Sequence, residues 1–441
     1  MTSKLRYKAL VLALLAMTSL PRPLHGAELD GKFTSLFESR QNRDGTREAV
    51  LDNYLRLDLD KLFVTPLSLH AYGKYGTELN NGPDSTDIYH LYAQYRTFQG
   101  ETDLKLGRFP LESHRFLTLD GAYLTMRPEG RIGAAIYAGQ PRYLEFYPEQ
   151  IQNRFRDTGD YLAGGKLFLQ GVEGARANVY YSREGKDGTV YREIVGAGGG
   201  KDFRFNLLSS EVKMSADGSL DYNTDQAAID KLTARLFFAF DKKLRLLMQA
   251  DRYDIRDDYP ADRQLIISLL STGREDRIFY TLTYDLSTNF SVYQGSVFTG
   301  LRMPDGVWQN GTIVRGGVTV NFIKPAGLDL DAGVYRFESF LAKASGVSAT
   351  LKWRPLRLWT TQAGVEAVLY DAPFRSNKTA KTVSAEVGYS PVSRLKLAFF
   401  AEQSDNPEFK SDFRTGLRLD YNFGFATGSP GLSGPRKEVR Q

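Results

Sequence analysis

The stretch from Ala349 to Tyr370, ATLKWRPLRLWTTQAGVEAVLY, alternates apolar and polar residues on both sides of a short break. Leu351 and Trp353 occupy alternate positions before the break, and Val365 and Leu369 do so after it. A period of two is typical of a β-strand, because successive side chains on a strand point to opposite faces. The stretch therefore predicts two strands joined by a tight turn.

Pro355 stands at the break between these two arms. Proline has no backbone N–H donor and fixes φ, so it disrupts the hydrogen-bonded ladder inside a strand. We therefore expect Pro355 to lie in the turn of the hairpin rather than in either arm.

The same alternation recurs along the chain. It is present in the segments Leu51–Leu59, Leu67–Tyr75, Tyr89–Tyr95, Ala175–Tyr181 and Phe413–Phe425. No helical period persists for long, so the pattern predicts an all-β protein built from many short strands.

Composition agrees with a large β protein and excludes several kinds of chemistry. The chain of 441 residues contains 25 Tyr and 27 Phe, and 25% of its residues are charged. It contains no cysteine. Disulfides, thiolate metal sites, a cysteine nucleophile, covalent attachment of c-type haem and a lipidated N-terminal cysteine are therefore excluded.

Residues 1–27 have the three-part layout of a secretory signal peptide. Three basic residues precede an apolar run from Ala9 to Met17, and a polar stretch with prolines follows. The run is too short for a membrane helix, which needs roughly 20 apolar residues. The 57 basic and 52 acidic residues give a net charge of +5, and removal of the four basic residues of this segment leaves +1. No clustered basic face suggests a nucleic-acid partner.

Tight breaks between strands alternate with connections that are more polar and usually longer. The tight breaks fall at 60–63, 99–100, 128–130, 171–172, 241–242, 286–288, 324–326, 355 and 391–392. This rhythm predicts a transmembrane antiparallel β-barrel, with short periplasmic turns and longer extracellular loops. The count is about 22 strands, within a range of 20 to 24, over residues 28–425. Both ends of the barrel then lie on the short-turn side, and residues 426–441, rich in Gly, Pro and Ser, form a disordered periplasmic tail.

A soluble all-β protein is the alternative, since its strands also alternate. The signal peptide, the rhythm of the connections and the many charged residues in mid-strand favour the barrel, and no repeat period supports a propeller or solenoid. The barrel also explains Trp353 and Trp359, which would lie in an aromatic girdle at the membrane interface.

In this layout the chain resembles a porin-like outer-membrane protein of Gram-negative bacteria. The segment 413–425, FRTGLRLDYNFGF, is similar to the closing strand of such proteins, although there the strand usually ends the chain. The resemblance implies a channel in the outer membrane for passive diffusion of small hydrophilic solutes or ions, in contact with lipid and without a cofactor. A wide, cysteine-free barrel is also similar to the barrel of porin-cytochrome conduits. The alternative function is therefore a sheath around a multihaem cytochrome.

Charged residues are the candidates for the pore. A barrel of about 22 strands encloses a wide lumen unless something fills it, and two long connections at 140–160 and 254–276 could fold inward or stay outside. Rings of charge are how pores select solutes. The candidate constriction comprises Arg108, Glu112, His114, Arg115, Asp120, Arg142, Arg154 and Arg156. The candidate lumen-facing residues are Arg56, Asp58, Lys74, Arg96, Arg176, Lys352, Glu366, Lys396, Arg414, Arg418 and Asp420.

An enzyme is not expected. Without the signal peptide the histidines are His70, His90 and His114, and no sequence motif with a known mechanism accompanies them. His70 and His90 are expected on the same lumen face but several residues apart. Three scattered histidines have no ligand spacing for a metal.

Overall fold

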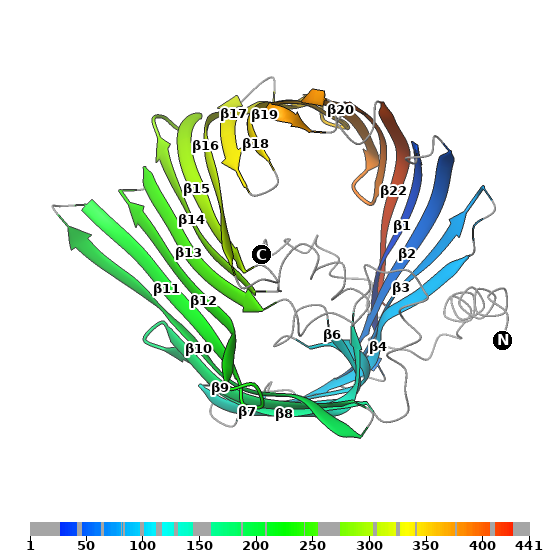
Figure 1. The fold of residues 1–441 in the computed structure, drawn as a ribbon. Coiled ribbons are helices and arrows are strands. Elements are labelled where there is room, and N and C mark those ends of the chain that lie inside the picture. The colour runs from blue at the N-terminus through cyan, green and yellow to red at the C-terminus, as the bar shows by residue number, and fades with distance from the viewer. Residues whose placement is uncertain are drawn as a thin grey trace.

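The structure is a computed structural model in which the described residues form 22 β-strands and close into one barrel (Figure 1). The described residues are 27–41, 46–62, 66–80, 82, 84–97, 101–111, 117–127, 131–143, 160–186, 188–207, 210–241, 243–254, 274–302, 307–322, 327–339, 342–374, 377–405 and 411–426. The strands are β1 (Glu28–Gln41), β2 (Arg47–Asp60), β3 (Leu67–Glu78), β4 (Ser85–Arg96), β5 (Thr102–Pro110), β6 (Leu117–Met126), β7 (Ile132–Tyr143), β8 (Tyr161–Val172), β9 (Ala175–Lys186), β10 (Thr189–Leu207), β11 (Ser210–Asn223), β12 (Ala228–Phe240), β13 (Leu244–Asp254), β14 (Arg274–Asp285), β15 (Phe290–Arg302), β16 (Trp308–Phe322), β17 (Leu328–Glu338), β18 (Lys343–Leu356), β19 (Trp359–Phe374), β20 (Asn377–Val392), β21 (Leu395–Asp405) and β22 (Asp412–Ala426).

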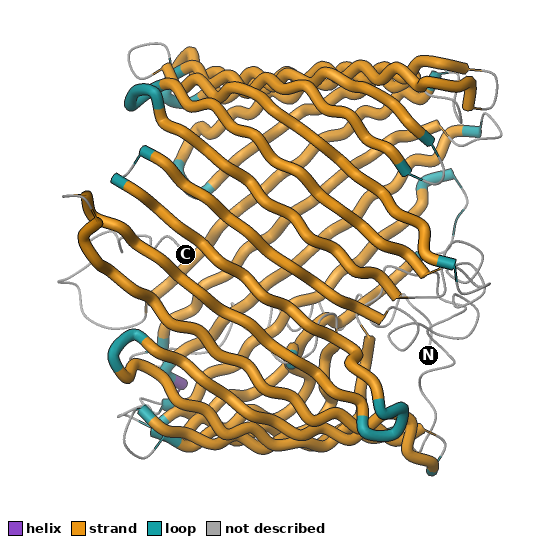
Figure 2. Tube along the Cα trace, turned by 60° about the vertical axis from the view of Figure 1, so that its left-hand side comes forward, coloured by secondary structure: helices purple, strands orange, loops and turns teal. Residues whose placement is uncertain are grey.

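Each strand pairs antiparallel with its neighbours in the chain, and the first strand pairs antiparallel with the last. Glu28 of β1 lies opposite Ala426 of β22, and the pairing continues to Ser39 and Thr415. Figure 2 shows the strands crossing the wall obliquely, as a closed barrel requires. Closure leaves no sheet edge with unpaired backbone groups, which is the condition for a sheet to lie in a bilayer. Among the described residues no helix is long and apolar enough to span a membrane.

The connections lie at two rims, which we call the terminal rim and the opposite rim. The terminal rim carries both ends of the barrel and the short turns, as the sequence predicts. The opposite rim carries the two long connections, 144–160 and 255–273, which lie outside the described residues except for Asp160. Other connections at this rim, residues 187–188 and 375–376, are only two residues long, so the opposite rim carries both long and short connections. The predicted signal peptide except Ala27, and the predicted tail except Ala426, which is the last residue of β22, lie outside the described residues.

Local backbone geometry explains the tight turn between β8 and β9 at the terminal rim. Between β8 and β9, Glu173 and Gly174 have φ angles of 49° and 75°, and Gly171 just before them has 74°. Two successive residues with positive φ are the geometry that matches the twist of a two-residue hairpin. The register also shifts between Gln170 and Val172, so a bulge precedes this turn.

Pro355 lies inside β18 and not in the turn, so the prediction from the sequence is wrong by two residues. The turn is residues 357–358, and the register between β18 and β19 shifts between Trp353 and Leu356. Pro391 of β20 lies at the equivalent shift, between Tyr389 and Val392. A bulge interrupts the ladder locally, so a residue without an N–H donor is tolerated there.

Candidate functional site

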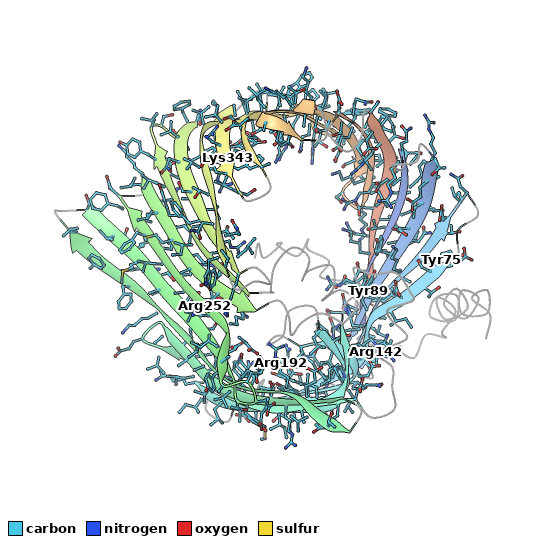
Figure 3. The ribbon with its side chains drawn as sticks, viewed as in Figure 1. Tyr75, Tyr89, Arg142, Arg192, Arg252 and Lys343 are labelled. Carbon is cyan, nitrogen blue, oxygen red and sulfur yellow. The ribbon has the colours of Figure 1, made fainter. Side chains whose placement is uncertain are left out.

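The two faces of the barrel wall differ in chemistry. On one face, exposed aliphatic side chains recur at alternate positions, for example Val347, Val365 and Leu417, whose exposed fractions are 53%, 52% and 57%. The other face carries most of the charged side chains in mid-strand. Figure 3 shows Tyr75, from the aliphatic face, outside the ring of strands and Arg192, from the charged face, inside it. We therefore call these the outer face and the inner face.

The outer face has a different boundary at each rim. At the terminal rim it carries aromatic residues: Trp359 lies 4.6 Å from the ring of Tyr389, and Trp353 is 44% exposed. At the opposite rim it carries ion pairs, such as Arg252 with Asp276 at 2.7 Å and Arg336 with Asp371 at 2.7 Å. The uncharged band between them is the part of the wall that hydrocarbon can cover.

The residues that the sequence predicts to face the lumen all lie on the inner face. Most of them form an ion pair with a charged side chain on the same strand or on a nearby strand. Their positions follow from the register and from these contacts. The pairs are Arg56–Asp58 at 2.7 Å, Lys74–Asp52 at 2.9 Å, Arg96–Asp103 at 3.1 Å, Arg176–Asp217 at 3.9 Å, Lys396–Glu386 at 3.6 Å, Arg414–Asp412 at 2.9 Å and Arg418–Asp420 at 2.7 Å. Glu366 accepts a hydrogen bond from the Tyr335 hydroxyl, and Lys352 lies opposite Asp329 and Gln362 in the register.

The structure places the candidate constriction differently from the sequence. Arg108, Asp120 and Arg142 do form one cluster, in which both arginines bond the Asp120 carboxylate. However, the neighbouring residue Phe109 packs against inner-face residues, so Arg108 must point to the other side of β5. Arg108 therefore shares the outer face with the exposed Leu106. The cluster therefore lies on the outer face near the opposite rim. The remaining candidates, Glu112, His114, Arg115, Arg154 and Arg156, lie outside the described residues.

A row of aromatic rings crosses the inner face from β2 to β7, and the alternation in the sequence alone does not reveal it. We call this row the aromatic band; its members are Tyr54, Tyr72, Tyr89, His90, Tyr92, Phe109, Tyr123 and Tyr137. Successive ring centroids lie between 5.0 and 6.4 Å apart. Ring pairs at such distances attract each other. Phe109 and Tyr137 are buried, whereas the other rings are half-buried.

A β-bulge explains why two successive residues of β4 both belong to this band. The register between β3 and β4 shifts, so that Tyr72 lies opposite His90 and Gly73 lies opposite Ile88. Tyr89 is the extra residue, and its ring lies 5.0 Å from that of Tyr72. The alternation in the sequence assigns Tyr89 to the apolar face, and the bulge brings it to the inner face instead.

Charged and polar groups border the band. The ammonium of Lys105 lies 5.9 Å from the centre of the Tyr92 ring and 5.5 Å from that of Tyr123, which are cation–π distances. His70 stacks on Tyr92 at 4.8 Å, and its Nδ1 lies 2.7 Å from the Asp58 carboxylate. His70 and His90 are diagonal neighbours two positions apart in the register. In the described part of the chain no group of three or more possible ligands is arranged for a metal ion.

One buried ion pair fixes the inner face near the opposite rim. Arg192 of β10 bonds the carboxylate of Asp230 at 3.0 Å, and the Asp230 side chain is only 3% exposed. Asn223 donates a further hydrogen bond to the same oxygen. Asp230 reaches the inner face because the register between β11 and β12 shifts at this point. A buried charge held by two strong donors is geometrically specific.

These features define a transmembrane β-barrel of the bacterial outer-membrane type: an antiparallel barrel with an even number of strands, an aliphatic outer band, an aromatic girdle and a polar interior. No family model and no curated protein matches the sequence. Among solved structures, the chain is similar to Pseudomonas aeruginosa OpdK with vanillate (10% identity, TM-score 0.41, covering 90% of this chain and 99% of that one). It is also similar to the P pilus usher PapC translocation pore (11%, 0.47, 90% and 99%) and to Acinetobacter baumannii OccAB4 (10%, 0.43, 92% and 100%).

Proposed function

We propose that the chain is an outer-membrane channel through which small hydrophilic solutes and ions diffuse passively. The observation that supports this proposal is the contrast between the two faces of one closed wall. The aliphatic outer face suits lipid, and the inner face carries ion-paired side chains of both signs. Charged side chains on a lumen wall are compatible with water and tune the selectivity of a pore.

The decisive measurement is the conductance of the purified full chain in planar bilayers, with the reversal potential taken under a KCl gradient. Steady open steps are expected. A barrel that inserts but stays closed would overturn the proposal and would favour the sheath around a multihaem cytochrome.

One pair of variants tests whether the inner face borders the path of the ions. Lys352 on the inner face of β18 and Lys381 on the outer face of β20, where it lies opposite Asp405 near the opposite rim, are both exposed lysines. Lys352→Glu removes a positive charge from the pore and adds a negative one, so the reversal potential should move toward cation selectivity. Lys381→Glu makes the same change in charge outside the pore and should move it much less. Equal shifts in the two variants would contradict the assignment of the faces.

A further inference from the structure

The aromatic band offers flat apolar surfaces at mid-height on the inner wall. Tyr54, Tyr72 and Tyr92 lie near the middle of β2, β3 and β4, away from both rims. Their rings are half-buried, so part of each remains accessible from the lumen. The rest of the inner wall is rich in ion pairs, so this band is where a solute can bury apolar surface against the protein.

The charges that border the band balance. The charged side chains of the inner face that lie nearest the rings of β2–β5 are four acidic and four basic ones, namely Asp52, Asp58, Asp87, Asp103, Arg56, Lys74, Arg96 and Lys105. Glu48, Asp60 and Glu78 lie on the same face nearer the ends of β2 and β3. Most of them are paired: Lys74 with Asp52, Arg56 with Asp58 and Arg96 with Asp103. A balanced, paired surface does not favour an anion over a cation. It does present fixed hydrogen-bond donors and acceptors on both sides of the rings.

Polar capacity also remains beside the rings. The side chains of Arg56 and Arg96 are 61% and 60% exposed, so a solute in the lumen can reach their guanidinium groups. Gln94, which is 8% exposed, donates its amide to both carboxylate oxygens of Asp103 at 2.8 Å. Hydroxyl groups can both donate and accept, so they can bond such paired groups without breaking the charge balance.

We propose that the aromatic band binds saccharides, with a sugar ring stacked on Tyr72 and Tyr92 and its hydroxyls bonded to the bordering polar groups. A pyranose has an apolar face of C–H groups with hydroxyls around its edge. The band has the matching arrangement, because its rings are bordered by paired charged groups. This inference rests on the proposed channel, because the band faces the lumen. It assigns to that channel a class of preferred solute.

The test uses the full chain in detergent and in planar bilayers. Binding of maltotriose is measured by saturation-transfer NMR, which does not depend on conduction, and block of the ion current is measured in parallel. Sorbitol is the matched control solute, because it carries similar hydroxyls but no ring. Maltotriose is expected to bind and to interrupt the current, whereas sorbitol should do neither.

Variants locate the site. Tyr92→Leu keeps an apolar side chain of intermediate size and removes the ring, and it should weaken maltotriose binding by about fivefold. Tyr293→Leu removes an inner-face ring from β15, on another part of the wall, and should leave binding unchanged. The shift of the folded band on an unheated gel verifies that both variants fold.

Each other outcome has a defined meaning. Equal binding of sorbitol and maltotriose, equal loss in the two variants, or tighter binding of benzoate than of maltotriose would overturn the saccharide site. Open steps with no binding of maltotriose would leave the channel intact and refute this inference alone. Absence of open steps together with ring-dependent binding would refute the channel but retain the site.

Discussion

Gly107 is a residue whose backbone conformation and close approach to the neighbouring strand both restrict its replacement. It lies in β5 opposite Tyr92 of the aromatic band, with a φ angle of 120°, which side chains of L-amino acids rarely adopt. A Cβ atom at this position would collide with the carbonyl oxygen of Leu91 on the neighbouring strand. The sequence shows only a glycine in a strand, which is consistent with a bulge or a close approach.

Gly107→Ala is therefore expected to lower the free energy of unfolding by ~1–3 kcal/mol, because it adds backbone strain and a clash. The measurement is urea unfolding of the barrel in lipid vesicles, followed by gel mobility. Gly165→Ala is the control, since Gly165 has no positive φ and a Cβ there would be 3.5 Å from its nearest neighbour. Equal losses in the two variants would show that the conformation of Gly107 is not the cause.

At the scale of single strands, alternation in the sequence predicts where strands lie and, wherever no bulge interrupts the strand, which residues share a face. The lumen candidates Arg56, Asp58 and Lys74 stand on one side of β2 and β3 because nothing interrupts the period there. Bulges are what the period cannot reveal. The shift at Tyr89 brings a second aromatic residue to the inner face, and the shift at Pro355 keeps a proline inside a strand.

The aromatic band illustrates the same limit between strands. Its members come from the six successive strands β2 to β7, so the band exists only once the register of these strands is fixed. The pairing of Tyr123 with Tyr137 is set by the hairpin of β6 and β7, but that of Tyr72 with His90 depends on the bulge. The cluster of Arg108 with Asp120 was predictable, whereas its place on the outer face required the exact alternation next to Phe109.

The faces of β18 and β19 allow a direct test of where lipid lies. Val365 is on the outer face in the middle of the wall, and Thr350 is on the inner face of the neighbouring strand. Val365→Arg should destabilise the barrel in vesicles by ~2–4 kcal/mol, because arginine on the lipid face at the midplane is costly. Thr350→Arg places the same side chain beside Asp331 in the lumen, and we expect its cost to be within ~1 kcal/mol. Urea unfolding in vesicles measures both, and a larger loss for Thr350→Arg would reverse the assignment of the faces.

At the scale of the whole molecule, one seam decides whether the sheet is a barrel. All other neighbouring strands are consecutive in the chain, whereas β1 and β22 come from its two ends. Their pairing can form only after the strands between them are in place, because its loop is nearly the whole chain. The register of the seam puts Asp420 within 3.4 Å of Lys32 and within hydrogen-bonding distance of Thr34, so inner-face polar contacts help to fix it.

The absence of cysteine makes this seam testable by a single introduced disulfide. Ser39 and Thr415 are opposite each other in the register of β1 and β22. Directly opposed residues of antiparallel strands have Cα atoms about 4.5–5.5 Å apart, within the range that a disulfide can bridge. Ser39→Cys with Thr415→Cys should therefore form an intramolecular disulfide under mild oxidation in the folded protein. The bond should leave the open-step conductance unchanged, because it links strands that are already paired.

Ser39→Cys with Thr379→Cys is the matched control, because Thr379 belongs to β20, which pairs with β19 and β21 and not with β1. Mobility on non-reducing gels and the mass of the cross-linked peptide report the bond in each case. Cross-linking of the control pair alone, or of neither pair in a folded barrel, would show that β1 and β22 do not close the wall in this register. The inner face would then be an open sheet, and a closed path for solutes would no longer follow from it.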